Sequence, residues 1–464
     1  MIDKDFEKTY VDRGGASLDL GDGELDELFS GALSRTLSDL NDAGPVIILP
    51  PDITRYHSRA GFFTGLASRE LKNRLGAVLP ALGTHMAMTA PEMQRMFPNT
   101  PQDKFIVHDW RNQITELGRI DADFVQNVTE GAVDYDWPVQ VNKLLCKGGS
   151  GKGSSGISSP SGSFSLILSI GHVVPHEVAG MANHAKNIFI GTGGKEAIDK
   201  SHFAGAAFGM EKIMGRAENP VRSLFDEGFR RFAGALPPVL WVLTVMGRRT
   251  NSEADAAGKA ELEAHGPLAV RGLYVGFGRE CFEKAAALSA VVNIETMDEP
   301  IRKAVVYLEP EEFRTTWLGN KAIYRTRMAI ADGGELLILA PALERFGEDL
   351  GVDSLIRKYG YRSGVDIKAK AASNADLREN LSAAAHLIHG SSEGRFTIRY
   401  CPGPGLSQNE IESVGFEWGD LKEAQARYDV TRLAPGWNSL SDGERIFFIP
   451  NPGLGLWAER KHFN

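Results

Sequence analysis

Four short, strongly apolar runs, each followed directly by polar residues, constrain the possible folds of this 464-residue chain most. They lie at residues 46–49, 77–82, 105–107 and 163–170. Helical patterns lie between them: leucines recur at helical spacing from 25 to 40, and Thr89 with Glu92 forms a capping box. Apolar strands that alternate with helices predict an α/β fold with mostly parallel sheets. Polar residues that follow the strands then gather at one sheet edge, where ligands usually bind.

The length of the chain predicts more than one domain. A polar, charged stretch at 248–265 separates the first α/β region from a second one, with strands expected at 268–275, 303–308 and 335–340 and helices at 280–289 and 317–331. We therefore predict an N-terminal catalytic and cofactor-binding domain over 1–260 and a C-terminal α/β domain over 266–464. The site is expected in the cleft between the domains.

A stretch rich in Gly and Ser, residues 147–162, interrupts the first domain and is typical of a flexible surface insert. Its GSGKGSS segment is similar to a phosphate-binding P-loop. The pattern fails, however, because Cys146 occupies the first glycine position and Gly153 follows Lys152.

Charge and cysteine content exclude several classes of protein. A net charge of -9 argues against general affinity for nucleic acid. The three cysteines form no CxxC pair, so neither a zinc knuckle nor a disulfide framework is supported. The first residues contain no apolar secretory segment, and the longest apolar run, 233–246, is too short to span a membrane. We expect a cytoplasmic protein that binds neither nucleic acid nor membranes, and its oligomeric state stays open.

The candidate site residues follow the predicted strands: Asp52 and Arg55, then His85, then His176, Lys186 and His202. One reading is a zinc hydrolase, because His176-Glu177 begins like H-E-x-x-H, but the second histidine position is Gly180. His172 and His176 are also four apart, yet Pro175 between them opposes a helix that would direct both at one metal. Another reading is acid–base catalysis, in which two histidines serve opposite faces of a carbon and an arginine holds a carboxylate. The residues alone leave both readings open.

Several short motifs resemble the nickel-dependent lactate racemase family of 2-hydroxyacid racemases and epimerases. They are PDITR at 51–55, LGTHMAMT at 82–89, NPVR at 219–222, and the spacing of Pro175-His176, Lys186 and His202. The resemblance covers most of residues 45–235 and, more loosely, 317–340. It implies an isomerase whose N-terminal domain carries the catalytic residues.

The resemblance also implies a cofactor, the nickel-pincer nucleotide, a pyridinium mononucleotide that holds nickel through two sulfur arms and a ring carbon. By this resemblance, Lys186 ties one arm to the protein through a thioamide and His202 completes the nickel coordination. His85 and His176 are the two acid/base residues. Asp52 and Arg55 lie near cofactor and substrate, with Arg55 on the substrate carboxylate or the cofactor phosphate, and Lys321 helps to hold the carboxylate.

The chain departs from the family pattern at three places. A Ser-Gly-Gly run before the lysine is replaced by Ala182-Asn183-His184-Ala185, a glutamine by Leu318, and the region 376–386 has no tryptophan. The expected substrate is therefore a 2-hydroxy acid that is either lactate or a larger or more polar acid, such as a sugar acid. Two other functions stay open: a non-catalytic binder or carrier of the nickel nucleotide, and a metal-dependent hydrolase.

Overall fold

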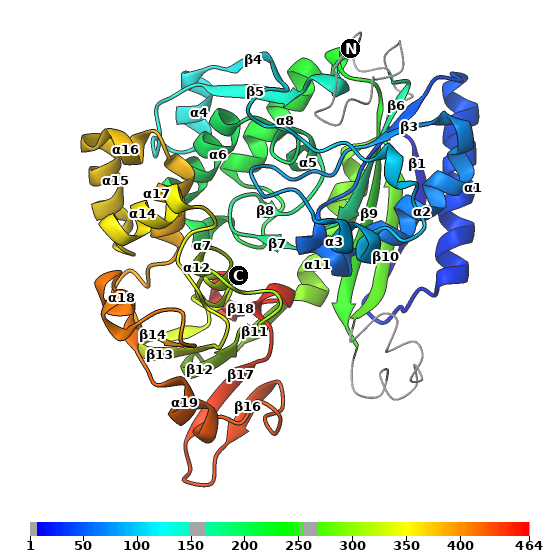
Figure 1. The fold of residues 1–464 in the computed structure, drawn as a ribbon. Helices are drawn as coiled ribbons and strands as arrows, with labels where there is room; N and C mark the ends of the chain where they lie inside the picture. The colour runs from blue at the N-terminus through cyan, green and yellow to red at the C-terminus, as the bar shows by residue number, and fades with distance from the viewer. Residues whose placement is uncertain (1–6, 148–163, 250–252, 254–267, 464) are drawn as a thin grey trace. The chain divides into compact units, whose positions relative to one another are not determined.

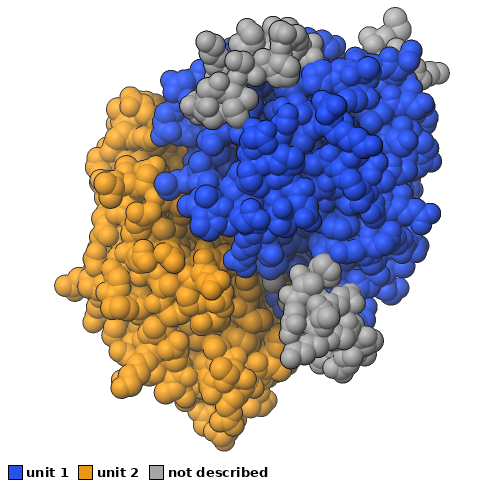
Figure 2. Space-filling model, turned by 45° about the vertical axis from the view of Figure 1, so that its right-hand side comes forward, with its two compact units in different colours: residues 1–201, 215–293 blue, residues 202–214, 294–464 orange. Residues whose placement is uncertain are grey.

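A computed structural model describes residues 7–147, 164–249, 253 and 268–463 (Figure 1). The chain divides into two compact units, coloured separately in Figure 2: unit 1 comprises 1–201 and 215–293, and unit 2 comprises 202–214 and 294–464. The predicted insert at 147–162 lies outside the described residues except for Lys147, and so does most of the predicted boundary at 248–265.

Unit 1 contains a six-stranded sheet with the order β1-β10-β9-β6-β2-β3. The strands are β1 Thr9–Gly14, β10 Leu268–Gly276, β9 Val239–Arg248, β6 Leu166–His172, β2 Val46–Leu49 and β3 Leu75–Val78. β9, β6, β2 and β3 are parallel, whereas β10 and β1 run antiparallel at one edge. The central strands are apolar along their length and buried, as expected for parallel strands that are covered on both faces.

Helices cover both faces of this sheet (Figure 1). Trp241 and Thr244 of β9 are three residues apart and point to opposite faces. Thr244 donates a hydrogen bond to the carbonyl of Ser58, beside α2 (Ala60–Leu71), which packs on α1 (Asp22–Leu40). Trp241 packs against His184, which stacks on Phe282 of α11 (Arg279–Asn293).

The remaining elements of unit 1 are short or lie outside the sheet. They are η2 (Ile53–Ser58), η3 (Lys72–Arg74), α3 (Ala90–Met96), η4 (Gln102–Lys104), β4 (Ile114–Ile120), α4 (Ala122–Val128), β5 (Trp137–Asn142), η5 (Lys143–Leu145), β7 (Pro175–His176), β8 (Gly180–Met181), α5 (Ala185–Phe189), α8 (Pro220–Phe232) and η6 (Ala233–Ala235). The capping box predicted at Thr89 and Glu92 is confirmed at the start of α3. Helix α6 (Lys195–Phe208) crosses from unit 1 into unit 2 at residue 202.

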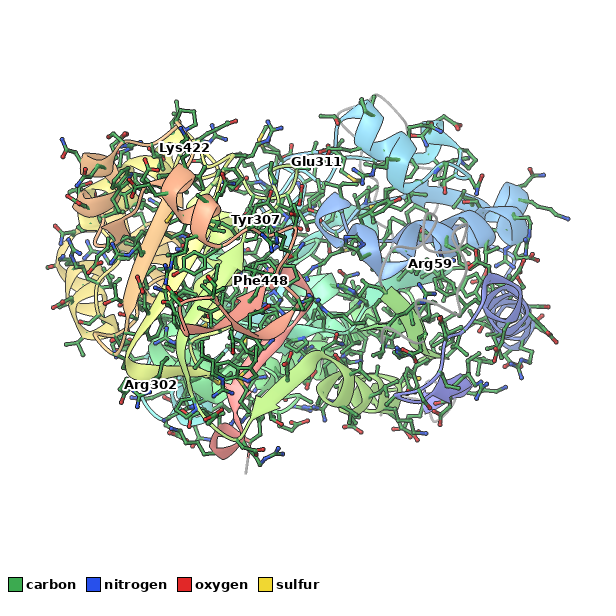
Figure 3. The ribbon with its side chains drawn as sticks, turned by 90° about the horizontal axis from the view of Figure 1, so that it is seen from below. Arg59, Arg302, Tyr307, Glu311, Lys422 and Phe448 are labelled. Carbon is green, nitrogen blue, oxygen red and sulfur yellow. The ribbon has the colours of Figure 1, made fainter. Side chains whose placement is uncertain are left out.

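Unit 2 contains a second six-stranded sheet with the order β15-β14-β13-β12-β17-β16, parallel except for β16. The strands are β12 Ile301–Tyr307, β13 Ile330–Ala340, β14 Thr397–Pro402, β15 Glu417–Trp418, β16 Gly436–Ser439 and β17 Arg445–Ile449. β11 (Ile294–Met297) pairs with β18 (Leu456–Glu459). Tyr307 and Phe448, labelled in Figure 3, belong to the apolar cluster on one face, which also contains Val305 and Leu339.

The helices of unit 2 are mostly short. They are α7 (Met210–Ile213), α12 (Thr316–Gly319), α13 (Lys321–Tyr324), α14 (Leu350–Tyr359), α15 (Gly364–Ser373), α16 (Ala375–Arg378), α17 (Leu381–His389), α18 (Gln408–Ser413), α19 (Leu421–Arg427), η7 (Pro452–Leu454) and η8 (Arg460–His462). With two such sheets, the predicted α/β class is confirmed. No helix in the described part of the chain combines the length and the apolar character needed to cross a bilayer.

Three details differ from the sequence predictions. Residues 105–107 form no strand, because Phe105 makes a single bridge to Val78, the last residue of β3, and Val107 is exposed. The helix predicted over 317–331 is two short helices, α12 and α13, after which β13 begins at Ile330. The division between the units falls after residue 293 instead of near 260–266, because β10 pairs with β9 and α11 packs on the same strands.

Candidate functional site

The candidate site of unit 1 lies beyond the carboxyl ends of its parallel strands. Asp52 follows β2, His85 follows β3 and His176 follows β6. Asn187 of α5 donates hydrogen bonds to the carbonyl of Leu49 (3.3 Å) and the hydroxyl of Ser169 (2.9 Å), which fixes α5 beside the ends of β2 and β6.

The loop that carries His85 is joined to the end of α5. The amide of Gly83 donates to the carbonyl of Gly191 (2.8 Å). Gly83 has a φ of 59°, a left-handed conformation that glycine adopts without a steric cost, and the Ile190 carbonyl lies 3.3 Å from where a Cβ would be. Because α5 carries Lys186, this contact links the His85 loop to the segment of Lys186.

The Asp52 carboxylate and the His85 imidazole are hydrogen-bonded across two of these loops. The Asp52 Oδ2 atom lies 2.7 Å from His85 Nδ1, and the other carboxylate oxygen accepts hydrogen bonds from the amide (3.2 Å) and hydroxyl (2.5 Å) of Thr54. Burial would raise the pKa of Asp52, but the interaction with His85, the hydrogen bonds from Thr54 and the nearby Arg55 hold that pKa below its usual value. Since a carboxylate accepts only, the Nδ1 atom of His85 carries the proton and Nε2 of the neutral ring is left as a base.

His176 is held by the backbone. Its Nδ1 atom accepts hydrogen bonds from the amides of Val178 (3.1 Å) and Ala179 (3.4 Å). The Glu177 carboxylate is 3.7 Å from the same nitrogen, which is too long for a hydrogen bond, so the amides decide the protonation of the ring. The neutral His176 ring therefore carries its proton on Nε2, opposite to the arrangement in His85.

Lys186 lies in the first turn of α5 and is mostly buried. Within the described part of the chain no hydrogen bond or ion pair engages its amine. Burial and the positive charges of Arg55 and Arg222 lower the pKa of Lys186 to about 8. The carboxylates of Glu177 and Asp52 act in the opposite direction. These electrostatic interactions place Lys186 among the charged residues of the two loops, and a substantial fraction of its amine is neutral near pH 8.

Arg55 supplies a positive charge that the described residues leave without a hydrogen bond or an ion pair. It is half-buried in η2, with φ -116° and ψ 31°, and its amide donates to the Asp52 carbonyl (3.0 Å). A guanidinium beside a buried amine suits the recognition of a carboxylate or phosphate.

The run before Lys186, which departs from the family pattern, has a backbone that favours glycine. Asn183 and His184 both have positive φ values, 73° and 59°, and His184 has a ψ of -140°. The His184 ring is buried, with its centroid 4.4 Å from that of Trp241 and 5.2 Å from that of Phe282. Its burial and nearby arginines lower its pKa well below the ordinary value, so His184 packs as a neutral aromatic ring.

Five of the seven predicted site residues lie in unit 1: Asp52, Arg55, His85, His176 and Lys186. Asp52 contacts His85, and the Lys186 amine is within electrostatic range of Asp52, Arg55 and Glu177, the neighbour of His176. His202, half-buried on α6, and Lys321, the first residue of α13, belong to unit 2. The Lys321 amine lies 3.7 Å from the Glu312 carboxylate and 5.4 Å from the centre of the Phe313 ring. No group of three or more His, Cys, Asp or Glu residues within the described ranges is arranged to hold a metal ion.

Two charged residues near Lys186 were missed by the sequence predictions. Glu177 is adjacent to His176. The sequence drew attention to Glu177 only as the second residue of an incomplete H-E-x-x-H zinc motif. Arg222 belongs to the quoted NPVR motif, which gave no indication of its role. His108, by contrast, is a structural histidine, because it is buried and hydrogen-bonded to the Gly193 carbonyl and the Asn142 side chain.

A pocket of about 580 Å³ in unit 1 lies elsewhere than these residues. His184, Phe229, Phe277 and Arg279 contribute to its lining, whereas none of the five grouped site residues does. The site is therefore defined by its hydrogen bonds and charges and not by this pocket.

The fold and the strand-end residues define an α/β protein with a charged site at the carboxyl edge of a parallel sheet. No protein-family profile and no curated protein matches the sequence. Solved structures do match: a protein from Thermotoga maritima has a TM-score of 0.76 at 22% identity over 96% of this chain and 100% of its own. The lactate racemase apoprotein from Thermoanaerobacterium thermosaccharolyticum has a TM-score of 0.60 at 15% identity over 91% of this chain and 89% of its own. The chain thus has a fold like that of lactate racemase.

Proposed function

We propose that this chain is a racemase or epimerase of a 2-hydroxy acid that works with a nickel-pincer nucleotide attached through Lys186. The observation that carries the proposal is the buried Lys186 amine, which lacks an ion-pair partner among the described residues and has a pKa lowered to about 8. An amine that is partly neutral at physiological pH suits a covalent link to an electrophilic group. The racemase-like fold supports the same assignment.

The residues present fit the cofactor. Lys186 is the attachment point, the half-buried Arg55 is placed to bind an anion, and the His202 imidazole is a suitable ligand for nickel beside sulfur donors. When bound, the nickel nucleotide supplies an acceptor for the hydrogen, with its electron pair, on the substrate α carbon.

The two histidines handle the substrate's hydroxyl proton. His85 Nε2 takes this proton, since Asp52 holds the ring's own proton on Nδ1. His176 presents an Nε2–H, since its Nδ1 accepts from the backbone, and donates to the substrate oxygen. For the other stereoisomer His176 is the base, which requires the neutral tautomer with its proton on Nδ1 in place of the two amide hydrogen bonds, and His85 then returns a proton from Nε2. We propose that Arg55 binds either the substrate carboxylate or the cofactor phosphate and that Lys321 helps to hold the carboxylate. A cytoplasmic location stays a prediction from the sequence.

The decisive measurement is intact-protein mass together with metal analysis, after production in a host that makes the cofactor. We expect an adduct on Lys186 and nickel in proportion to the chain. No adduct and no nickel, with the cofactor demonstrably available, would overturn the proposal. A panel of lactate, larger 2-hydroxy acids and sugar acids then identifies the substrate.

The second candidate function is a non-catalytic binder or carrier of the nickel nucleotide. It is favoured by the departures at 182–185, where a buried His184 occupies a backbone conformation suited to glycine. A carrier retains adduct and nickel but racemises no acid in the panel. The hydrolase reading gains no support, because His176 and Gly180 pair in the β7–β8 hairpin instead of sharing a helix face.

A further inference from the structure

The segment between His176 and Lys186 is held by the first turn of helix α8. Asn219 caps this helix: its side-chain oxygen accepts from the Arg222 amide (3.0 Å). The Asn219 side-chain nitrogen is then free to turn outward, and it donates to the carbonyls of Ala179 (3.0 Å) and Arg216 (3.1 Å). One side chain thus both starts α8 and ties it to the end of the His176 hairpin.

Arg222 extends the same contact. Its guanidinium is fully buried and donates to the carbonyls of Met181 (2.5 Å) and Asn183 (3.2 Å). The guanidinium carbon lies 4.4 Å from the centre of the Phe282 ring, which supports the charge from the other side. Asn219 and Arg222 together therefore bind three alternate carbonyls, at residues 179, 181 and 183.

The backbone at this point needs such support. Asn183 and His184 both adopt positive φ, which is costly for residues with a Cβ and persists only when surrounding contacts hold it. The bound carbonyl of Asn183 lies at the peptide that joins these two residues. His176 lies three residues before Ala179, and Lys186 lies three residues after Asn183. The held segment 179–183 therefore constrains the positions of both His176 and Lys186.

We propose that Asn219 and Arg222 are positioning residues, which form a clamp on the backbone of 179–183 and thereby orient His176 and Lys186. The effect of the clamp on catalysis rests on the proposed function. Its effects on the order of the backbone and on the Lys186 amine do not. Arg222 also contributes to the charge around the Lys186 amine, together with Arg55, Glu177 and Asp52. The proposed role of the NPVR motif is thus to hold the backbone of residues 179–183.

The test uses four variants of the full chain. Arg222→Met removes both the donors and the charge, and Arg222→Lys keeps the charge with fewer donors. Asn219→Asp keeps the helix cap, because a carboxylate oxygen still accepts from the Arg222 amide, but loses the donor to Ala179. Arg230→Met is the control, since Arg230 is an exposed residue of the same helix that pairs with Glu227.

Two measurements are made without cofactor or substrate. Hydrogen–deuterium exchange reports the amides of 176–187, with β2 as the internal reference. The rate of acetylation of Lys186 by N-hydroxysuccinimidyl acetate, mapped by peptide mass spectrometry, reports the amine as a function of pH.

Arg222→Met is expected to speed exchange in 176–187 by about tenfold or more while β2 stays protected, and to move the acetylation midpoint upward from about 8. Arg222→Lys should restore the midpoint and only part of the protection. Asn219→Asp should speed exchange around 179–181 with little change in the midpoint. Arg230→Met should match the wild type in both.

Wild-type exchange and midpoint in both Arg222→Met and Asn219→Asp would overturn the proposal, and so would an equal loss of protection in β2 and 176–187. If Arg222→Met does not fold, Asn219→Asp and Arg222→Lys decide the question. If the wild type takes up no adduct while the variants still show these local changes, that result would contradict the proposed function and support the clamp.

Discussion

The two histidine-bearing segments of unit 1 differ in what holds each imidazole. His85 is bound by a carboxylate: Asp52 contacts Nδ1, and the His85 side chain is 44% exposed. His176 is bound by two backbone amides, and its side chain is only 7% exposed. A carboxylate accepts and an amide donates, so the two neutral rings carry their protons on opposite nitrogens.

This difference means that the same residue type presents an acceptor at Nε2 in His85 and a donor at Nε2 in His176. In the proposed function His85 takes a proton at Nε2, whereas the neutral His176 ring donates a hydrogen bond from Nε2 to the substrate oxygen. The half-exposed His85 imidazole on its Asp52 partner is open to change by pH or mutation, whereas the buried β7–β8 hairpin is held by backbone hydrogen bonds and by α8. The predictions below test each half of this comparison.

The largest effect is expected from removing either imidazole. His85→Ala and His176→Ala should each lower turnover of the 2-hydroxy acid by about 10²- to 10⁴-fold, the usual contribution of general acid–base catalysis. The adduct on Lys186 and the bound nickel should be retained, as measured by intact mass and metal analysis. His85→Asn and His176→Asn are matched controls, because each keeps a group at the anchored position but lacks the distal nitrogen; wild-type turnover in any of the four would contradict the assignment.

The second effect concerns the buried segment and the stability of the cofactor-free protein. The pKa of Lys186 falls from 10.5 to about 8 on folding, which corresponds to about 3 kcal/mol. The unfolded chain holds this proton more tightly, so the penalty is fully present below pH 8 and is relieved as pH rises from 8 to 10.5. Lys186→Met should therefore raise the free energy of unfolding by up to about 3 kcal/mol at pH 7 and much less at pH 10.

Urea unfolding at both pH values measures this difference. Lys8→Met is the control, since Lys8 is exposed and pairs with Asp39, and its effect should stay within about 0.5 kcal/mol. A Lys186→Met protein that is destabilised at both pH values would show that the amine is not held in a strained, charged environment.

The third effect concerns the hydrogen bond between Asp52 and His85. Asp52→Asn keeps a side chain beside His85 but removes the negative charge, and we expect turnover to fall about tenfold, the value of one charge-assisted hydrogen bond at a partly exposed site. The pKa of Asp52 is held below its usual 3.8, so the pair persists above that pH and is lost as pH falls through the lowered pKa. Protonation of Asp52 should therefore lower wild-type turnover only in acid, and the Asp52→Asn variant should lack this acid-side decrease. Identical pH profiles of turnover would show that Asp52 does not affect the function of His85.

The residues at the strand ends could be predicted from the sequence because a pattern of neighbouring residues marks them. An apolar run followed by polar residues predicts a strand end, and the parallel arrangement brings Asp52, His85 and His176 to one edge of the sheet. The proton position on each ring was not predictable, because it depends on partners 33 residues away for His85 and on the β7–β8 hairpin for His176. The contact of Arg222 with Met181 spans 41 residues and left no trace in local periodicity.

Two local predictions failed where tertiary contacts decide the structure. Residues 105–107 have the composition of a strand, but β3 ends at Val78 and offers a partner to one residue only. The stretch 317–331 has helical composition, but Asn320 lies between two short helices, and its side chain accepts a hydrogen bond from the Tyr400 hydroxyl (2.7 Å). The partners that decide these two structures, Val78 for Phe105 and Tyr400 for Asn320, are distant in sequence and cannot be inferred from the neighbouring residues.

A third histidine, His108, gives the smallest expected effect and shows what a structural imidazole does. Its Nε2 donates to the Gly193 carbonyl and its Nδ1 accepts from Asn142, both at 3.0 Å. Burial lowers the pKa of His108 to about 4, against the opposing influence of the Gly193 hydrogen bond and Asp109. The unfolded chain takes up this proton first, so stability falls as pH drops from 6.5 towards 4.

His108→Gln should lower the free energy of unfolding by about 1 kcal/mol at pH 7, the value of one lost hydrogen bond, and leave turnover unchanged. The deficit should shrink or reverse near pH 4.5, because glutamine has no proton to take up. Urea unfolding at both pH values, with turnover at pH 7, measures this. A large loss of turnover at full stability would place His108 with His85 and His176, and the contrast between a proton-transferring and a structural histidine in unit 1 would have to be abandoned.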